Sequence, residues 1–200
     1  MEYDTDKLIL TDVDGVLLAW EDHFHAYMHS QGHERAYEGV TYWQETHYPG
    51  LSEDAARQAV FNFNTSAWMM AIPAFRDARS GVARLVEHGY RFHAITAMGT
   101  DPNAKKLRWI NLEQTFGKDV FVELTTTDSY DPDAKREALS KYRDSGLPWI
   151  EDSTKNATLG HELGLRSILM EHEHNREFEA KHIERVSSWA NIYGLLVGSD

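Results

Sequence analysis

Short apolar runs alternate with helical repeats of apolar residues along most of this 200-residue chain. The first run, Leu8-Ile9-Leu10, is typical of a buried parallel strand. Further strands are predicted at 90–95, 119–124, 148–150 and 167–170, and helices at 76–88, 102–116, 133–143, 154–163 and near 178–190. Strands that alternate with helices of this length predict an α/β fold, with a Rossmann-like parallel sheet of five strands and helices on both faces.

Residues 17–75 interrupt this alternation and are rich in aromatic side chains, among them Trp20 and Trp68. One further helix is predicted at 53–63, with Ser52 as its N-cap. The segment is too long for a loop inside a compact domain. We therefore expect a small helical cap at 17–75, inserted after the first strand into a core made of 1–16 and 76–200.

The bulk composition narrows the class of protein. The chain is 42% hydrophobic and 26% charged, which is ordinary for a globular protein. A net charge of −12 disfavours an extended nucleic-acid interface. There is no cysteine for disulfides or thiol catalysis, and no apolar run approaches the roughly 20 residues of a membrane span. The N-terminus lacks the pattern of a signal peptide, so a cytoplasmic protein without a membrane partner is expected; the oligomeric state is left open.

The candidate chemistry begins where the first strand ends, at Asp12-Val13-Asp14-Gly15. Open α/β sheets bind ligands at the carboxyl ends of their strands, so both carboxylates are expected at such an edge. Taken alone, the pattern also suits a turn. Three other strand ends carry polar groups: Thr96, Lys135 at the start of a helix, and the pair Glu151 and Asp152. Each of these also has an ordinary structural interpretation, as a strand-end hydroxyl, an exposed helix charge or a helix cap.

Together these positions resemble, in order and rough spacing, the four motifs of the haloacid dehalogenase superfamily of phosphatases. The resemblance implies that Asp12 is a nucleophile that forms an aspartyl-phosphate, and that Asp14 is the general acid and base. It implies that Thr96 donates a hydrogen bond to the phosphoryl group and that Lys135 neutralises the nucleophile and the phosphate. The dehalogenases that name the superfamily lack an acid at the Asp14 position.

The same resemblance implies a Mg²⁺ site. Its ligands would be the Asp12 carboxylate, the Asp14 backbone carbonyl and Asp152, with Glu151 as a second-layer residue or an alternate ligand. Mg²⁺ favours a few carboxylates, water and phosphate oxygens, which suits phosphoryl transfer.

Two segments resemble the 5′-nucleotidase C, or deoxyribonucleotidase-like, branch. Trp20 stands where that branch has an aromatic residue against the nucleobase, and Trp68-Met69 begins a segment like its return from the cap. Ala97 and Met98 follow Thr96 in place of a hydroxyl residue and a nearby lysine, so these substrate-side positions depart from the branch. The predicted substrate is a small phosphorylated molecule, with nucleoside monophosphates favoured.

Several alternatives stay open at this stage. The aromatic residues also suit the core of a small cap. Other substrates are a different phosphometabolite or a nucleic-acid terminal phosphate, and a non-catalytic binding protein with this fold is a further possibility. The histidine pairs His23-x-His25 and His172-x-His174 match no zinc spacing, so a solvated loop is expected for the second pair and metal binding is the alternative.

Overall fold

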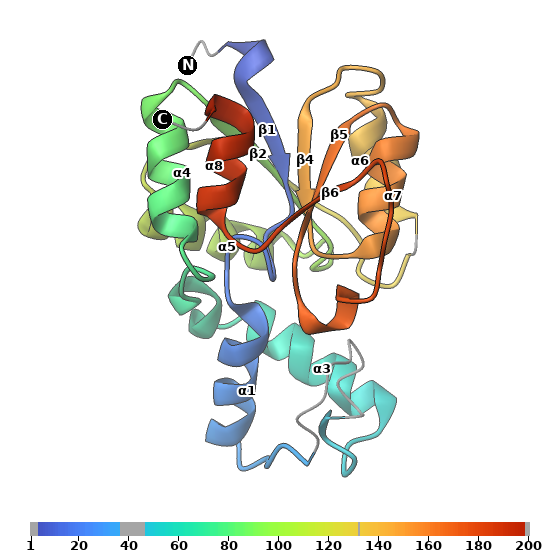
Figure 1. Ribbon diagram of the computed structural model, residues 1–200. Helices are drawn as coiled ribbons and strands as arrows, with labels where there is room; N and C mark the ends of the chain where they lie inside the picture. Colours follow the sequence, from blue (N-terminus) through green and yellow to red (C-terminus); the bar gives the residue numbers. More distant parts are fainter. Residues whose placement is uncertain (1–3, 37–46, 132, 199–200) are drawn as a thin grey trace.

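The computed structural model describes residues 4–36, 47–131 and 133–198. In this part of the chain one parallel sheet carries six strands in the order β3-β2-β1-β4-β5-β6. The central strand β1 lies between β2 and β4, so the ends of these three strands are neighbours (Figure 1). The strands are β1 (Leu8–Thr11), β2 (Arg91–Thr96), β3 (Phe121–Thr126), β4 (Pro148–Glu151), β5 (Arg166–Met170) and β6 (Glu184–Val186).

Two layers of helices cover the sheet. Ile9 belongs to the apolar cluster shared with α4 (Ala78–Glu87), α5 (Pro102–Phe116) and α8 (Trp189–Val197). Leu8 and Leu10 belong to the cluster shared with α6 (Ala134–Ser140) and α7 (Thr154–Glu162). Neighbouring residues of a strand face opposite sides of a sheet, so β1 is buried by helices on both faces. This confirms the predicted Rossmann-like α/β core.

The prediction of five strands and a last helix near 178–190 is wrong. Residues Glu184–Val186 form β6, and the last helix, α8, begins at Trp189 after the Ser188 N-cap. A three-residue strand is too short to show a hydrophobic period. It is defined by its tertiary pairing with β5 and by an ion pair between Arg166 and Glu184. In this pair Arg166 Nε lies 2.8 Å from Glu184 Oε2, and Arg166 Nη2 lies 2.9 Å from Glu184 Oε1.

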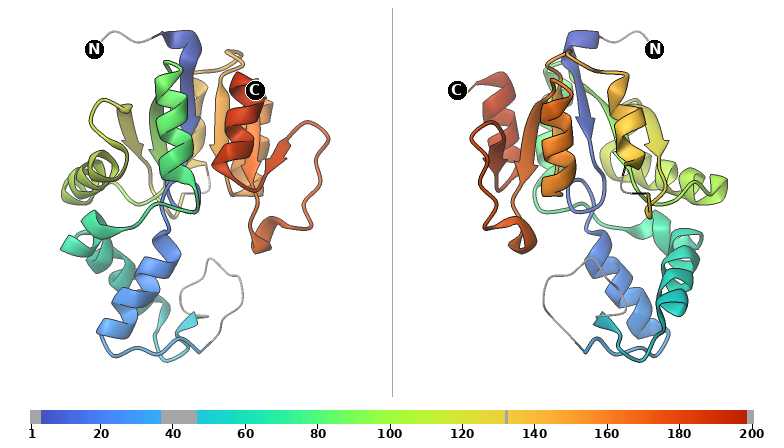
Figure 2. Two further views of the ribbon diagram at one scale, coloured as in Figure 1. Left: turned by 60° about the vertical axis from the view of Figure 1, so that its left-hand side comes forward. Right: turned by 90° about the vertical axis from the view of Figure 1, so that its right-hand side faces the viewer.

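A helical insertion follows β1, as predicted. It contains α1 (Trp20–Ser30), α3 (Glu53–Asn64) and the short 3-10 helix η2 (Ala67–Ala71), while residues 37–46 lie outside the described ranges. Its outgoing and returning chains pair as antiparallel backbone: Ala19 N donates to Pro73 O, and Phe75 N donates to Leu17 O. Figures 1 and 2 show this cap at the end of the sheet where the parallel strands terminate.

Two short 3-10 helices complete the described elements: η1 (Thr5–Lys7) before β1 and η3 (Glu173–Asn175) after β5. Among the described helices, none has both the length and the apolar character needed to cross a membrane.

Candidate active site

Asp12 and Lys135 meet at the carboxyl end of the sheet. Asp12 follows β1, and Lys135 lies in the first turn of α6, the helix that follows β3. Lys135 Nζ lies 2.9 Å from Asp12 Oδ2 and 2.8 Å from Glu151 Oε1, and all three side chains are buried. Burial by itself lowers the pKa of Lys135, but the two carboxylates outweigh it and raise the pKa above its usual value. The ammonium is therefore held charged between two acids.

Glu151 lies behind this pair and is fully buried. Oε1 accepts from Lys135 Nζ at 2.8 Å and from Asn156 Nδ2 at 2.7 Å. Oε2 accepts from the backbone N–H groups of Asp152 at 2.8 Å and Ser153 at 3.3 Å. Burial raises its pKa, but these donors, Lys135 foremost, lower it overall. With four donors on its oxygens, Glu151 serves to hold Lys135 and the start of α7.

Asp152 brings a third carboxylate to the same place. Oxygen atoms of Asp12, Glu151 and Asp152 lie within 4.8 Å of one another. Burial first, and then the charge of Glu151, raise the pKa of both Asp12 and Asp152 well above the usual range. Such like-charge crowding favours a cation among the oxygens.

The donor set of this cluster fits a hard divalent cation. Gly15, with φ +78, approaches so closely that a Cβ there would lie 2.6 Å from Asp152 Oδ2. Four carboxyl groups, those of Asp12, Asp14, Glu151 and Asp152, face two cations, Lys135 and Arg108. Because Glu151 is already engaged by its four donors, Asp12 and Asp152 are the side chains that could hold Mg²⁺ or a similar ion.

Asp14 lies beside this cluster but takes a different partner. Nη2 of Arg108, a buried residue of α5, lies 2.8 Å from Asp14 Oδ1 and 2.9 Å from Oδ2. Burial raises the pKa of Asp14, and the Arg108 charge opposes that rise. Nothing in the sequence pattern singled out Arg108, since it is one more residue on a predicted helix.

Thr96 is buried at the end of β2, next to β3. Ala97 is exposed, and Met98 is buried with its backbone carbonyl accepting from Asn64 Nδ2 at 3.4 Å. The loop after β2 is therefore held by α3 of the cap.

Comparison with known proteins bears on the fold. No family model and no curated protein matches the chain. Among solved structures, CbbY from Rhodobacter sphaeroides in complex with phosphate is 18% identical over 93% of this chain and 96% of its own, with a TM-score of 0.61. A mutant of CbbY in complex with xylulose-(1,5)bisphosphate matches over 92% and 95%, with 18% identity and a TM-score of 0.60.

Two further solved structures with lower sequence identity share the same architecture. The haloacid dehalogenase-like hydrolase SP0104 from Streptococcus pneumoniae is 13% identical over 96% of this chain and 99% of its own, with a TM-score of 0.65. The L-2-haloacid dehalogenase from Xanthobacter autotrophicus is 10% identical over 97% and 99%, with a TM-score of 0.61. The chain has the haloacid dehalogenase-like fold. This confirms the resemblance at the level of the superfamily fold and gives no support to the 5′-nucleotidase branch.

Within this haloacid dehalogenase-like fold, the predicted substrate-side aromatics pack largely against other side chains of the cap, in an apolar cluster that continues into the core. The Trp20 ring stacks on Phe24 at 4.8 Å between centroids, and its Nε1 donates to Asn64 Oδ1 at 3.1 Å. Trp68 is partly buried against His23, with ring centroids 5.3 Å apart, and Met69 is fully buried. These contacts are those of a cap core.

His172 and His174 were expected in a solvated loop, but both are partly buried at the site. His172 Nε2 lies 2.7 Å from the Gly15 carbonyl, and His174 Nε2 lies 3.2 Å from the Asp152 carbonyl. The two rings stack with centroids 5.0 Å apart, and the Phe75 ring stacks on His172 with centroids 4.9 Å apart. The loop after β5 therefore contacts both the chain that leaves for the cap, at Gly15, and the chain that returns from it, at Phe75. The position of the two histidines depends on strand order, which local sequence does not reveal.

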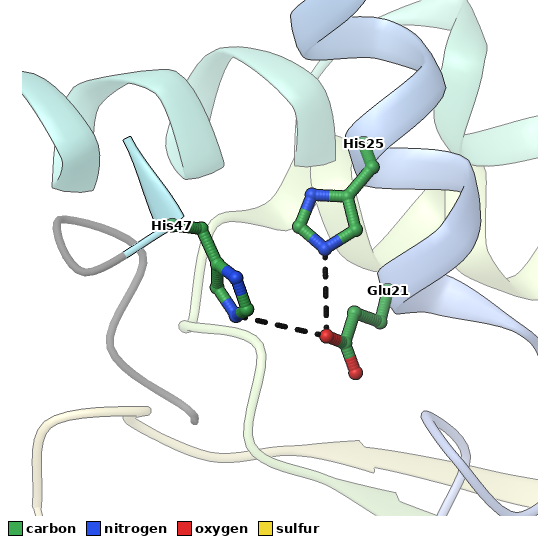
Figure 3. A group of neighbouring side chains, drawn as sticks. All are labelled: Glu21, His25 and His47. Carbon is green, nitrogen blue, oxygen red and sulfur yellow. Dashed lines mark hydrogen bonds and ion pairs between the residues drawn. The ribbon is translucent and has the colours of Figure 1, made fainter. Parts of the chain in front are cut away.

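Besides Asp12, Glu151 and Asp152, two more groups among the described residues could offer metal ligands: Asp152 with His172 and His174, and Glu21, His25 and His47 in the cap (Figure 3). Glu21 Oε1 lies 3.4 Å from His25 Nε2, 3.7 Å from His47 Nε2 and 3.4 Å from Arg35 Nη2. Arg35 Nε donates to His47 Nδ1 at 3.2 Å, so the proton of a neutral His47 is on Nε2. That nitrogen then has no lone pair for a metal. In this cap group the Glu21 carboxylate lies among nitrogen atoms of His25, Arg35 and His47, and it links α1 to Arg35 and His47.

Proposed function

We propose that this protein is a Mg²⁺-dependent phosphomonoester hydrolase that acts through an aspartyl-phosphate on Asp12. The observation that carries the proposal is the buried contact of 2.9 Å between Asp12 and Lys135, beside Asp152, at the carboxyl end of the central strand. A lysine there permits a carboxylate and a phosphate dianion to approach each other. The haloacid dehalogenase-like fold supports hydrolase chemistry at this edge only by analogy.

In the first step an oxygen of Asp12 attacks phosphorus, and the bond from phosphorus to the leaving oxygen breaks. Asp14 gives its proton to that oxygen, so the product leaves as an alcohol. Lys135 offsets the negative charge that gathers on the phosphoryl oxygens, and Thr96, at the adjacent strand end, is the candidate hydroxyl donor to them. Both carbon–oxygen bonds of the Asp12 carboxyl group stay intact, and one of its oxygens now carries the phosphoryl group.

In the second step Asp14, now a carboxylate, takes a proton from water as the water oxygen attacks phosphorus. The bond between phosphorus and Asp12 breaks, which releases inorganic phosphate and restores the starting state of both acids. Mg²⁺ held by Asp12, the Asp14 backbone carbonyl and Asp152 would supply charge neutralisation and orientation of the phosphoryl oxygens when bound. The choice of a phosphatase over a dehalogenase rests on Asp14, because cleavage of a carbon–halogen bond needs no proton on the leaving group.

The proposed substrate is a small phosphorylated molecule. CbbY has been obtained with phosphate and with a sugar bisphosphate, which makes sugar phosphates one class to examine. Nucleoside monophosphates are the second class, supported by the sequence resemblance at Trp20 and Trp68. The contacts of Trp20 with Phe24 and Asn64 weaken that support, because a ring engaged in the cap core has less surface left for a base.

The test is a phosphate-release screen with and without Mg²⁺. The panel contains p-nitrophenyl phosphate, sugar phosphates, nucleoside monophosphates, an end-phosphorylated oligonucleotide and a 2-haloacid. We expect Mg²⁺-dependent phosphate release, and a phosphorylated wild-type protein after rapid acid quenching with ³²P-labelled substrate. Asp12→Asn should abolish both signals.

Undiminished phosphate release by Asp12→Asn would contradict the assigned nucleophile. Halide release without phosphate release would support a dehalogenase. No turnover of any compound would favour the non-catalytic binding protein.

A further inference from the structure

The side chain of Arg108 is fully buried in α5 and ends at the Asp14 carboxylate. A single nitrogen, Nη2, lies between both Asp14 oxygens, at 2.8 Å and 2.9 Å. Asp101 caps the N-terminus of the same helix by accepting from Ala104 N, and Asn111, one turn beyond Arg108, donates to the carbonyls of Met70 and Ile72. The helix is therefore fixed against the cap segment η2, and Arg108 reaches Asp14 from a rigid support.

Within the described part of the chain, the rest of the Arg108 guanidinium has no hydrogen-bond partner. Nε and Nη1 are buried, and neither forms a hydrogen bond with any residue in the described ranges. Other arginines of this chain are used differently: Arg76 donates to the carbonyls of Ser187 and Glu171, and Arg185 donates to those of Asn175 and Phe178. These two stabilise loops through backbone acceptors, whereas Arg108 does not.

A buried guanidinium with unpaired N–H groups is destabilising, and an apolar side chain of similar volume is often better tolerated at such a place. Destabilising groups of this kind concentrate at functional sites. The only partner of Arg108 in the described chain is the carboxyl group that the proposed mechanism uses twice for proton transfer. The contact with Asp14 therefore indicates the role of Arg108.

We propose that Arg108 is a positioning residue for Asp14, holding the carboxyl group where it can exchange a proton with the leaving oxygen and then with water. The inference rests on the proposed phosphatase function. Asp14 follows β1 on a turn and its side chain is about a quarter exposed (26%). Without Arg108, its carboxyl group would be free to rotate toward solvent. Proton transfer needs heavy atoms within hydrogen-bond reach, so a rotated carboxyl group would be a poor acid.

This role predicts an effect that depends on the leaving group. An alkyl phosphate releases a strongly basic oxygen that needs a proton from Asp14, whereas p-nitrophenyl phosphate releases a stable phenolate that does not. General acid catalysis contributes about 10²- to 10⁴-fold. We therefore expect Arg108→Met to lower kcat for glycerol phosphate by about 10-fold or more, and kcat for p-nitrophenyl phosphate only about 2-fold, with KM nearly unchanged for both.

A double-mutant cycle separates positioning from any general structural effect. In an Asp14→Asn background, Arg108→Met should cause no further loss of kcat, because the group that it positions is already missing. Arg108→Met should also unfold at the same denaturant concentration as wild type or at a higher one. Arg166→Met is the control, because Arg166 binds Glu184 and the Leu195 carbonyl. This variant should unfold at a lower denaturant concentration than wild type and keep the wild-type ratio of the kcat values for the two substrates.

Equal losses on both substrates, or an effect of Arg108→Met that persists in the Asp14→Asn background, would overturn the inference. If Arg108→Met fails to fold, Arg108→Lys gives the same test, because the shorter lysine side chain cannot place its ammonium between both Asp14 oxygens. This variant should also lose more kcat for glycerol phosphate than for p-nitrophenyl phosphate. A wild-type protein that releases phosphate from no compound of the full substrate panel overturns the proposed function itself. If the wild type is active and Arg108→Met has the same ratio of kcat values for the two substrates, only the role of Arg108 is overturned.

Discussion

The Lys135 ammonium lies 2.9 Å from the Asp12 carboxylate and 2.8 Å from the Glu151 carboxylate, buried at the carboxyl end of the sheet. The first contact belongs to the proposed chemistry, and the second holds the lysine in place. The two roles can be separated by experiment.

Lys135→Met should lower kcat for phosphate release by about 10²- to 10³-fold, as expected when one group that stabilises developing charge is removed. It should also lower the free energy of unfolding by about 3–5 kcal/mol, because Glu151 becomes a buried charge without its cation. Adding Glu151→Gln should restore much of the stability, measured by denaturant titration, but not the turnover. A double variant that regains activity would contradict the role of Lys135 in catalysis.

Mg²⁺ should stabilise the folded wild-type protein in proportion to the logarithm of its concentration above the dissociation constant. Asp152→Asn should remove this stabilisation, because it takes away one of the two carboxylates that could hold the ion. Asp14→Asn is the matched control, since the backbone carbonyl at that position is retained; it should keep the Mg²⁺-dependent shift in thermal unfolding while losing activity. Equal shifts in wild type and Asp152→Asn would exclude the proposed ligand.

Gly15→Ala and Gly32→Ala form a matched pair. Both glycines have a left-handed backbone, with φ of +78 and +83. Alanine in that conformation destabilises by roughly 1–2 kcal/mol at either position. At Gly15 the new Cβ would also lie 2.6 Å from Asp152 Oδ2, while at Gly32 it meets no atom of the described residues within 4 Å. Only Gly15→Ala should weaken Mg²⁺-dependent stabilisation, and a similar loss in Gly32→Ala would show that the contact with Asp152 is irrelevant.

His93 should make stability depend on pH. It is buried in β2, with Nδ1 2.7 Å from Tyr142 Oη and Nε2 2.8 Å from Thr125 Oγ1. Burial lowers its pKa from 6.5 to about 4. Between those values the unfolded chain binds a proton that the folded chain does not, so the free energy of unfolding falls as the pH falls through this window, by on the order of 3 kcal/mol.

The test of this prediction is urea unfolding at several pH values between 4 and 7. Subtracting the curve of His93→Gln from that of wild type isolates the contribution of His93 from those of the carboxylates. His29→Gln, at a side chain that is 73% exposed, should leave the slope unchanged. A His93→Gln curve parallel to the wild-type curve would contradict the assigned cause.

The local sequence was informative wherever an element carries its own signals. The helix predicted at 102–116 is α5 to the residue, because Asp101, Pro102 and Gly117 mark its ends. The strand ends at Asp12, Thr96 and Glu151 were predicted for a similar reason: each apolar run stops at a polar residue. The short strand β6 has no such signal, and its hydrogen bonds to β5 define it.

The sequence by itself determined the alternation of strands and helices, the insertion after the first strand, and the set of polar groups at the carboxyl edge. The hydrophobic period and the capping residues are local properties of the sequence. Parallel strands bring their carboxyl ends to one edge of the sheet in any strand order. The tertiary structure decided the partners: Glu151 behind Lys135, Arg108 on Asp14, and His172 at Gly15. These pairs join residues that are 16, 94 and 157 positions apart. Their contacts follow from strand order and helix packing, which no local pattern encodes.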